Sequence, residues 1–256
     1  MDKLLLNKTI IVTGTSRGMG KEMITLFAEN GANVYALART ATNEHKQLCD
    51  KLSIENDVRV IPYYFDINDN EKIKETIISI KKDAANGIDG LVNNAGITYN
   101  ALFQMTDINE LRNQFETNFF STFILTQYVS KLMVRNKKGS IVTVSSSAAI
   151  DCNSGKSAYG SSKAAVLCMA KCISQELAES GVRSNVICPG ITETEMISTM
   201  PDYIIDIQKE AQSIKEIAKP IDVANTAMFL LSDLSSYITG QVFKVDGGVT
   251  QFNKRK

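Results

Sequence analysis

The run Thr13-Gly14-Thr15-Ser16-Arg17-Gly18-Met19-Gly20 decides the fold. It follows a short apolar run, residues 9–13, that reads as a β-strand, and it leads into helical sequence over residues 21–29. A glycine-rich turn between a first strand and a helix is typical of dinucleotide-binding α/β proteins, because a pyrophosphate binds at the helix N-terminus. An ordinary βα turn that binds no dinucleotide is the alternative. It is the weaker interpretation, because the run follows the first strand of a chain in which predicted strands and helices alternate.

Three glycines of this run have separate roles in such a site. Gly14 would make the tight turn, Gly18 would let the backbone approach a pyrophosphate, and Gly20 would allow the helix to pack closely on the strand. The sequence therefore predicts a dinucleotide site in outline.

Beyond this turn, short runs rich in β-branched residues alternate with helix-length amphipathic segments. The further predicted strands are residues 33–37, 58–64, 90–92, 140–144, 184–187 and 241–245. Strands that are almost continuously apolar suit a parallel sheet covered by helices on both faces. We therefore expect one Rossmann-like α/β domain over residues 1–256, doubly wound, with the dinucleotide site within residues 9–118 and a catalytic and substrate-lid part within residues 139–215.

Size and charge narrow the classes of function. The chain has 256 residues, 44% of them hydrophobic, which suffices for one large core. Its formal net charge is zero and it has no long basic run, so nucleic acid is not an expected partner. The N-terminus does not resemble a signal peptide, and no stretch approaches the roughly 20 apolar residues of a membrane span. We expect a soluble, cytoplasmic protein with no membrane contact.

The cysteines and the single histidine argue against disulfides and metal. The cysteines are odd in number and lie mostly in apolar segments, so we expect reduced, buried thiols. They are Cys49, Cys152, Cys168, Cys172 and Cys188. His45 is the only histidine and stands in a polar stretch, where a surface position is expected. A metal site with histidine ligands is hard to build from it, so no metal is predicted.

A set of ordered motifs resembles the short-chain dehydrogenase/reductase family. The glycine run has the Thr-Gly-x-x-x-Gly-x-Gly spacing of that family rather than the tighter Gly-x-Gly-x-x-Gly. The other matches are Asn93-Asn94-Ala95-Gly96 after the fourth strand, Asn118 within a helix, Ser146 after the fifth strand, Tyr159-x-x-x-Lys163 at the start of the next helix, and Pro189-Gly190 after the sixth strand. The resemblance extends from about Lys8 to Gly248.

The spacing of Tyr159 and Lys163 indicates proton transfer. Residues four apart on a helix share a face, so the ammonium group can lie near the phenol. Lowering the tyrosine pKa from ~10 by about 3 units requires roughly 4 kcal/mol of preferential stabilisation of the phenolate. Lys163 and the positive nicotinamide ring of an oxidised cofactor are the expected sources. Tyr159 would then protonate a substrate carbonyl oxygen as hydride reaches the carbon, with a second hydrogen bond from Ser146.

A lone Tyr-x-x-x-Lys pair more often has a packed tyrosine and a solvated lysine. The accompanying motifs make this alternative weak. Ser145 and Ser147 flank the expected serine, so an assignment shifted by one residue stays open, and the family's spacing to the tyrosine selects Ser146. By resemblance, Lys163 also holds the ribose hydroxyls of the nicotinamide, and Asn118 keeps a water in a proton relay from Lys163 to solvent.

The resemblance also implies a set of cofactor contacts. Asp66 and Ile67 would border the adenine, and Thr194 would lie near the nicotinamide carboxamide. The full expected set is Gly14, Ser16, Arg17, Gly18, Met19, Gly20, Arg39, Asp66, Ile67, Asn94, Ala95, Gly96, Tyr159, Lys163, Pro189, Gly190, Ile191 and Thr194.

The end of the second strand indicates NADP(H) as the cofactor. Relatives that prefer NAD have an acidic residue where this chain has Ala38, and that carboxylate would bind the ribose 2′-hydroxyl and repel a 2′-phosphate. Arg39 and Arg17 instead offer guanidinium groups to the phosphate. Charged hydrogen bonds of roughly 1.5–3 kcal/mol each would favour NADPH by about tenfold or more. Two solvated surface arginines are the alternative.

The sequence says less about the substrate. By resemblance, the segment after the sixth strand is a mobile lid, and its residues Met196, Met200, Pro201, Tyr203 and Ile204 suit an acyl chain or another apolar ketone. Packing alone explains them equally well. No single charged anchor for the substrate is visible.

The chain most resembles the bacterial 3-oxoacyl-acyl-carrier-protein reductases, in residues 93–98 and 189–196. It departs from them where Tyr99-Asn100 replaces the usual Arg-Asp pair and where Ser180 replaces a basic contact. Reduction of a 3-oxoacyl thioester is the main prediction, with an acyl carrier protein as a candidate partner through Lys137 and Lys138. A solvated surface pair is the alternative for these two lysines, and it is the more frequent case. The alternatives are another ketone, of specialised or sugar metabolism, and a cofactor-binding subunit without turnover.

A homodimer or homotetramer is expected. Residues 161–177 have apolar side chains on more than one face of a helix, which one core cannot cover. In the family the corresponding helices form a four-helix interface.

Overall fold

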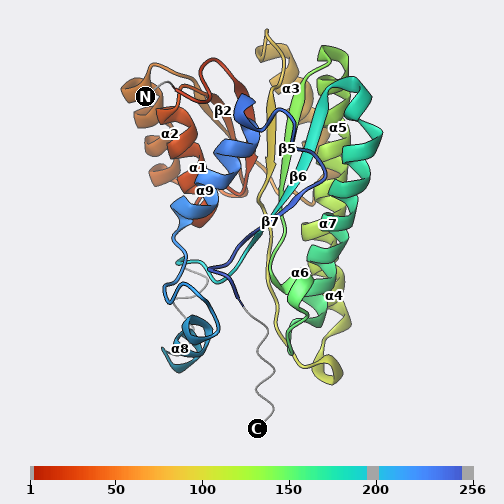
Figure 1. Cartoon of the computed structure of the whole chain (residues 1–256). Coiled ribbons are helices and arrows are strands. Elements are labelled where there is room, and N and C mark those ends of the chain that lie inside the picture. Colours follow the sequence, from red (N-terminus) through yellow and green to blue (C-terminus); the bar gives the residue numbers. More distant parts are fainter. Residues whose placement is uncertain (1–2, 195–201, 250–256) are drawn as a thin grey trace.

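The computed structural model describes residues 3–194 and 202–249, and its centre is a seven-stranded sheet in the order β3-β2-β1-β4-β5-β6-β7. The strands are β1 Thr9–Thr13, β2 Asn33–Ala38, β3 Val60–Tyr64, β4 Gly90–Asn93, β5 Gly139–Val144, β6 Val182–Pro189 and β7 Val242–Val245. Every neighbouring pair is parallel, so the strands end at one edge, the lower one in Figure 1. The order reverses between β1 and β4, the point at which such sheets bind ligands.

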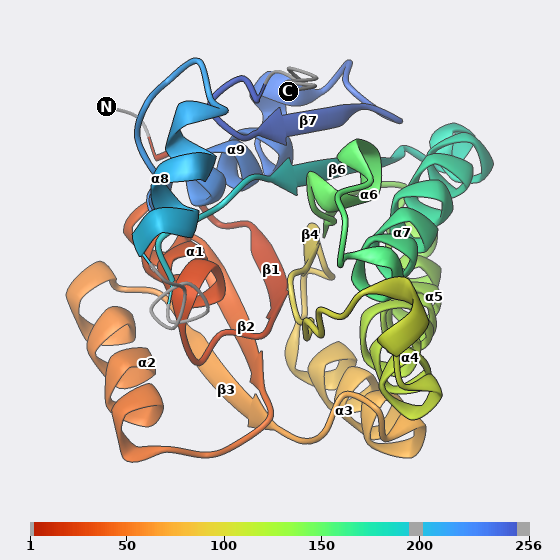
Figure 2. The same ribbon diagram turned by 90° about the horizontal axis from the view of Figure 1, so that it is seen from below.

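Helices cover both faces of the sheet, which confirms the predicted doubly wound α/β class (Figure 2). One face carries α1 Gly18–Glu29, α2 Asn43–Asn56 and α9 Pro220–Leu231, and the other carries α3 Asn70–Asp83, α5 Ser121–Asn136 and α7 Ser157–Glu176. The short helices α4 Ile108–Phe115, α6 Ala148–Asp151 and α8 Asp202–Glu210 lie at the carboxyl edge, with α8 on one side and α4 and α6 on the other (Figures 1 and 2).

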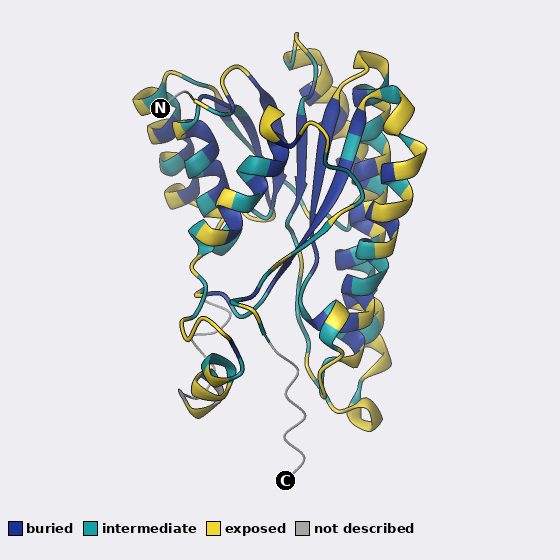
Figure 3. Ribbon diagram, in the orientation of Figure 1, coloured by how far each residue is buried: buried dark blue, intermediate teal, exposed yellow. Residues whose placement is uncertain are grey.

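Alternate residues of β1 supply two separate cores. Ile10 and Val12 pack into the layer beneath α1 and α9, where Phe27 is fully buried, and Ile11 packs into the layer beneath α3 and α5. A strand buried on both faces needs apolar residues at every position, which is why these runs lack polar alternation. Figure 3 shows the buried strands between helices whose outer faces are exposed.

The sixth strand is longer than predicted at both ends, and it includes one charged residue, Arg183. It starts at Val182, two residues before the predicted start at Ser184. Arg183 Nη2 donates to the carbonyl oxygens of Leu230 (2.9 Å) and Ser232 (3.3 Å), at the end of α9. The last carbonyl groups of a helix have no partner within the helix, and the guanidinium group supplies one. A polar side chain in this strand therefore joins the sheet to a helix.

The surface position expected for His45 is wrong. Its side chain is 3% exposed, because its neighbours form the first turn of α2 and fold it inward. The backbone N–H of His45 donates to the hydroxyl of Thr42, the residue that caps this helix. Polar sequence at a helix N-terminus thus reflects capping here rather than exposure.

The thiols are free, as expected, but their expected burial is only partly right. Cys49 and Cys188 are buried, whereas Cys152, Cys168 and Cys172 are exposed. Cys168 and Cys172 lie on the outer face of α7, whose inner face carries Val166 and Ala170 against the sheet. No helix in the described part of the chain is long and apolar enough to cross a membrane.

Candidate active site

The glycine-rich turn joins the ends of β1 and β4 around one threonine. The hydroxyl of Thr13 accepts hydrogen bonds from the backbone N–H groups of Asn94 and Ala95, both at 2.9 Å. The amide of Asn94 donates in turn to the carbonyl oxygens of Thr13 (3.0 Å) and Gly14 (3.2 Å). A Cβ atom at Gly20 would lie 2.1 Å from the Gly14 carbonyl oxygen, so only glycine lets α1 start this close to the turn.

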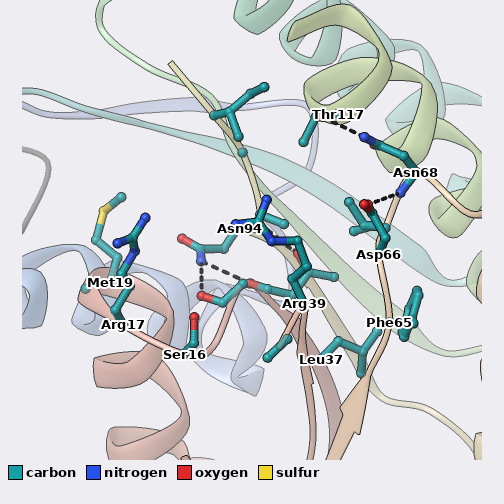
Figure 4. Close-up of a pocket in the computed structure, with 18 of the residues that line it drawn as sticks. Ser16, Arg17, Met19, Leu37, Arg39, Phe65, Asp66, Asn68, Asn94 and Thr117 are labelled. Atoms are coloured by element: carbon teal, nitrogen blue, oxygen red, sulfur yellow. Dashed lines mark hydrogen bonds between the residues drawn. The ribbon is translucent and has the colours of Figure 1, made fainter. Parts of the chain in front are cut away.

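A cavity of about 430 Å³ opens at the carboxyl ends of β1 to β4 (Figure 4). It brings together most of the expected cofactor contacts: Gly14, Ser16, Arg17, Gly18, Met19, Arg39, Asp66, Ile67, Asn94, Ala95, Gly96 and Thr194. Gly20, Tyr159, Lys163, Pro189, Gly190 and Ile191 do not line it. Residues far apart in sequence therefore form one wall because their strands end side by side.

Sequence analysis missed several residues of this cavity. They are Thr13, Leu37, Phe65, Asn68, Ile97, Asn113 and Thr117. Asn68 is held on both sides, since its backbone N–H donates to Asp66 Oδ1 (3.0 Å) and its side-chain amide donates to the Thr117 hydroxyl (3.0 Å). The sequence signal that could have identified Asn68 is its position two residues after Asp66, which was expected to border the adenine.

Arg17 and Arg39 both border the cavity (Figure 4). Ala38 lines it as well. Both arginine side chains are exposed. Arg17 comes from the glycine-rich turn and Arg39 from the end of β2, so positive charge stands where a carboxylate at residue 38 would have been negative. The arrangement suits a phosphate group at the open side of the cavity.

A buried series of hydrogen-bonded side chains supports the glycine-rich turn. Thr15 Oγ1 donates to the Leu37 carbonyl oxygen (3.2 Å), so it accepts from His45 Nε2 at 2.9 Å. His45 Nδ1 is then left to accept from the Tyr64 hydroxyl, also at 2.9 Å. Burial lowers the pKa of His45, which keeps the ring neutral. This Thr15-His45-Tyr64 chain ties the turn to α2 and β3.

The residues expected to carry the chemistry meet beside β5. Ser146 is the second residue after the end of β5, and its side chain lies near enough to the phenol of Tyr159 to lower the pKa of that group. Ser145 is engaged elsewhere, because its hydroxyl donates to the Lys163 carbonyl oxygen at 2.7 Å. Ser147 anchors the loop through its backbone N–H, which donates to the Pro189 carbonyl oxygen. The geometry therefore selects Ser146 among the three serines.

Lys163 is buried, and its ammonium donates to the Val144 carbonyl oxygen at 2.9 Å. Burial lowers its pKa to about 8. A Cβ atom at Gly96 would lie 3.2 Å from Lys163 Nζ and 3.1 Å from Asn118 Oδ1. Because Gly96 also lines the cavity, the ammonium lies directly behind the cavity wall.

Asn118 lies in a π-helical turn, Glu116–Phe120, between α4 and α5. Its Oδ1 accepts from the Ile97 N–H (2.8 Å), and its Nδ2 donates to the Ile97 carbonyl oxygen (3.0 Å) and the Ser162 hydroxyl (2.9 Å). Widened turns of this kind are frequent at functional sites. The side chain thus joins the loop after β4 to α7.

The protein alone does not lower the pKa of Tyr159. Burial of the phenol raises it, and the nearby side chain of Ser146 acts in the opposite direction. In the polypeptide by itself, these effects together leave the pKa of Tyr159 above its ordinary value.

The loop after β6 is described only as far as Thr194. The Gly190 N–H donates to the Val245 carbonyl oxygen (2.9 Å), so residues 189–190 stay paired with β7. Thr194 reaches the cavity, where a Cβ at Gly18 would lie 3.2 Å from its methyl group. Of the expected lid, Met196, Met200 and Pro201 lie outside the described residues, and Tyr203 is exposed on α8.

The lysine pair suggested for a carrier protein is on the wrong edge of the sheet. Lys137 and Lys138 directly precede β5, at its amino end, whereas the cavity lies at the carboxyl ends. The six residues of β5 place this lysine pair about 20 Å from the carboxyl edge of the sheet. Lys138 also forms an ion pair with Asp89 (2.9 Å). These lysines therefore do not border the site.

Over residues 3–194 and 202–249, no group of three or more His, Cys, Asp or Glu residues could hold a metal ion. The site described so far thus consists of hydrogen-bond donors, two arginines and a buried lysine around a cavity.

Comparisons with known proteins agree with this arrangement. A family model described as enoyl-(acyl carrier protein) reductase matches residues 14–250. The 3-oxoacyl-[acyl-carrier-protein] reductase of Thermotoga maritima is 36% identical over 94% of this chain and 97% of its own length. A 3alpha-hydroxysteroid dehydrogenase of Mediterraneibacter gnavus is 31% identical over 96% of this chain and 98% of its own length. The crystal structure of a 3-oxoacyl-[acyl-carrier protein] reductase from Brucella melitensis has a TM-score of 0.89 at 25% identity, covering 96% of this chain and 92% of that one.

Proposed function

Because the chain belongs to the short-chain dehydrogenase/reductase family, oxidoreductases that act on CH–OH and C=O groups, we propose that it reduces a ketone to a secondary alcohol with NADPH. The observation that carries the proposal is that Ser146 and Tyr159 lie close together beside the buried Lys163, next to a cavity of dinucleotide type. The single domain, with cofactor and substrate parts on one sheet, is part of the same proposal.

The residues of the cavity fit a nicotinamide dinucleotide. Gly14 and Gly18 leave the turn free of side chains where a pyrophosphate binds at the start of α1. Asn68 Oδ1 and Asn94 Oδ1 are buried oxygens without a hydrogen-bond partner, in residues that line the cavity. Buried acceptors of this kind favour a ligand that brings donors, such as ribose hydroxyls. When bound, the reduced cofactor supplies the hydride.

Three side chains would handle the proton. The hydroxyls of Tyr159 and Ser146 would both donate to the carbonyl oxygen of the substrate, and the Tyr159 proton would move to that oxygen as it becomes an alkoxide. Lys163 has a pKa of about 8, so it is mostly protonated at pH 7 and can stabilise the phenolate that remains. Asn118 would hold α7 and the Ile97 loop in register rather than touch the reacting atoms.

The preference for NADPH over NADH rests on three neighbouring residues. Arg17 and Arg39 bring two guanidinium groups to the cavity, and Ala38 brings no carboxylate. A ribose 2′-phosphate would gain charged hydrogen bonds there and meet no repulsion.

A 3-oxoacyl thioester is the proposed substrate. The relatives described above include reductases of such thioesters, and apolar side chains stand exposed at the carboxyl edge on either side of the site. They are Leu102, Phe103, Met105 and Ile108 before and on α4, and Tyr203 and Ile207 on α8. An acyl chain would cover part of this surface. A 3-keto steroid is a second candidate, favoured by the same apolar surface and by the steroid dehydrogenase relative.

We further propose a cytoplasmic homodimer or homotetramer. The outer faces of α5 and α7 expose Phe123, Cys168 and Cys172, which a second copy would cover.

The test is the initial rate of NADPH oxidation with acetoacetyl-N-acetylcysteamine, with NADH and a 3-keto steroid in parallel assays. Turnover that requires NADPH and is lost in Tyr159→Phe supports the proposal. Cofactor binding without turnover of any ketone would instead indicate a non-catalytic subunit.

A further inference from the structure

Lys156 stands next to the expected proton donor. It precedes α7 directly and lies three residues before Tyr159, so its side chain reaches over the tyrosine ring, with Nζ 5.7 Å from the ring centroid. The side chain is half-buried. The preceding residue is fixed as well, because the Gly155 carbonyl oxygen accepts from the Ala101 N–H at 3.1 Å. The lysine is therefore held next to the ring of Tyr159 and beside the loop that follows β4.

This position is unfavourable for a cation. The N-terminus of a helix carries partial positive charge, which disfavours a lysine at the cap. Partial burial removes water from the ammonium group and lowers its pKa. No carboxylate within residues 3–194 and 202–249 forms an ion pair with it, and Asp151 on neighbouring α6 pairs with Lys244 instead (3.1 Å). A half-buried cation without a carboxylate partner favours a ligand that supplies a negative or electron-rich oxygen.

We infer that Lys156 binds a second oxygen of the substrate, the one on the carbon two positions from the reacting ketone. Such an oxygen belongs to a 3-oxo acid, as a carboxylate, or to a 3-oxoacyl thioester, as a carbonyl. Ser146 and Tyr159 take the reacting oxygen, and the ammonium beside the same ring takes the other. This inference rests on the ketone reduction proposed above and names the feature of the substrate that the site selects.

The charge of Lys156 indicates which second oxygen it would bind more strongly, the carboxylate of a 3-oxo acid or the carbonyl of a thioester. An ammonium group that has lost part of its hydration gains more from a carboxylate than from a neutral carbonyl, because charge-assisted hydrogen bonds are about twice as strong as neutral ones. For this one contact, a free 3-oxo acid therefore gains more than a thioester, whose acyl chain can still gain from the apolar surface described above.

The experiment compares three ketones that differ only around the second oxygen: acetoacetate, acetoacetyl-N-acetylcysteamine and pentan-2-one. It measures kcat/KM for the wild type and Lys156→Met with NADPH. The matched control is Lys131→Met, since Lys131 Nζ lies 5.6 Å from the Tyr128 ring centroid on α5, a similar contact away from the site. We expect Lys156→Met to lower the preference for acetoacetate over pentan-2-one by at least tenfold, mainly through KM, and the preference for the thioester by less. Lys131→Met should leave both ratios unchanged.

Equal losses on all three ketones would overturn the inference, because Lys156 would then act on Tyr159 and not on the substrate. Unchanged ratios would overturn it as well. A calorimetric titration of acetoacetate into the enzyme with NADP⁺ separates this result from failure of the proposed function. If the wild type turns over none of the ketones, the reduction proposal fails, and weaker acetoacetate binding in Lys156→Met would still support the anion site. Binding that is absent, or equal in both proteins, would contradict it.

Discussion

At the scale of single residues, the three consecutive serines after β5 differ in what their hydroxyls can reach. Ser146 contacts Tyr159, while Ser145 is bound to the Lys163 carbonyl oxygen. We expect Ser146→Ala to lower kcat by about 10²–10³, the usual loss when one donor to a developing oxyanion is removed. Ser147→Ala is the matched control and should retain activity, and a comparable loss in that variant would contradict the assignment. Steady-state assays with NADPH at saturating ketone measure both.

Residue 38 offers a test of cofactor choice by charge alone. In Ala38→Asp, a carboxylate would repel a 2′-phosphate and accept from the 2′-hydroxyl of NADH. We expect the ratio of kcat/KM for NADPH to that for NADH to fall at least about tenfold, in line with charged hydrogen bonds of roughly 1.5–3 kcal/mol. Arg39→Ala should shift the ratio in the same direction, and Arg135→Ala, an exposed arginine on α5, should not. A ratio unchanged in Ala38→Asp would remove the basis for the NADPH preference.

Several residues of the site could be predicted because they repeat fixed spacings at strand ends, as in the glycine-rich turn and Tyr159-x-x-x-Lys163. His45 and Lys156 could not. Each stands in polar sequence at the start of a helix, and their burial depends on which distant elements pack against that turn: Thr15 and Tyr64 around His45, and the Ala101 loop beside Lys156. Local sequence does not contain this information.

At the scale of elements, the Thr15-His45-Tyr64 chain makes the glycine-rich turn sensitive to pH. The pKa of His45 is lowered in the folded chain, so the unfolded chain binds more protons at acid pH. The stabilisation is complete above the unfolded pKa of ~6.5 and is lost as pH falls below it, by at most about 1.4 kcal/mol per pH unit. Lys163, with a pKa of about 8, titrates above this window.

We therefore expect the thermal midpoint of the protein to fall between pH 7 and pH 5.5, and NADPH to bind more weakly over the same range. His45→Gln keeps a polar side chain but cannot take up the proton, so its midpoint should change less with pH. Differential scanning calorimetry and NADPH fluorescence titrations measure the two effects. An identical pH slope in wild type and His45→Gln would show that other groups cause it.

The extension of β6 shows how elements can depart from an apolar pattern. The predicted strand began at Ser184, yet the observed strand includes Arg183, whose guanidinium donates to carbonyl oxygens at the end of α9. Periodicity detects burial by hydrophobicity, so it misses a buried side chain whose partner is another element's backbone.

At the scale of the whole molecule, one sheet edge carries the site and the outer helices carry the expected contacts between copies. Cys172 lies on the exposed face of α7, where a charged side chain would have to be buried by a second copy. We expect Cys172→Arg to lower the mass measured by size-exclusion chromatography with light scattering. Ile54→Arg replaces an exposed apolar residue on α2 and should not change it. An unchanged mass in Cys172→Arg would place the interface elsewhere.

The absence of a side chain at Gly96 has a consequence for how substitutions in this protein would affect its function. Because residue 96 carries no side chain, the ammonium of Lys163 lies close behind the wall of the cavity. A methyl group at residue 96 would crowd Asn118 Oδ1 (3.1 Å) and Lys163 Nζ (3.2 Å). We therefore expect a substitution at this residue to disturb the proposed proton transfer before it disturbs the part of the cavity that lies at the glycine-rich turn and the arginines.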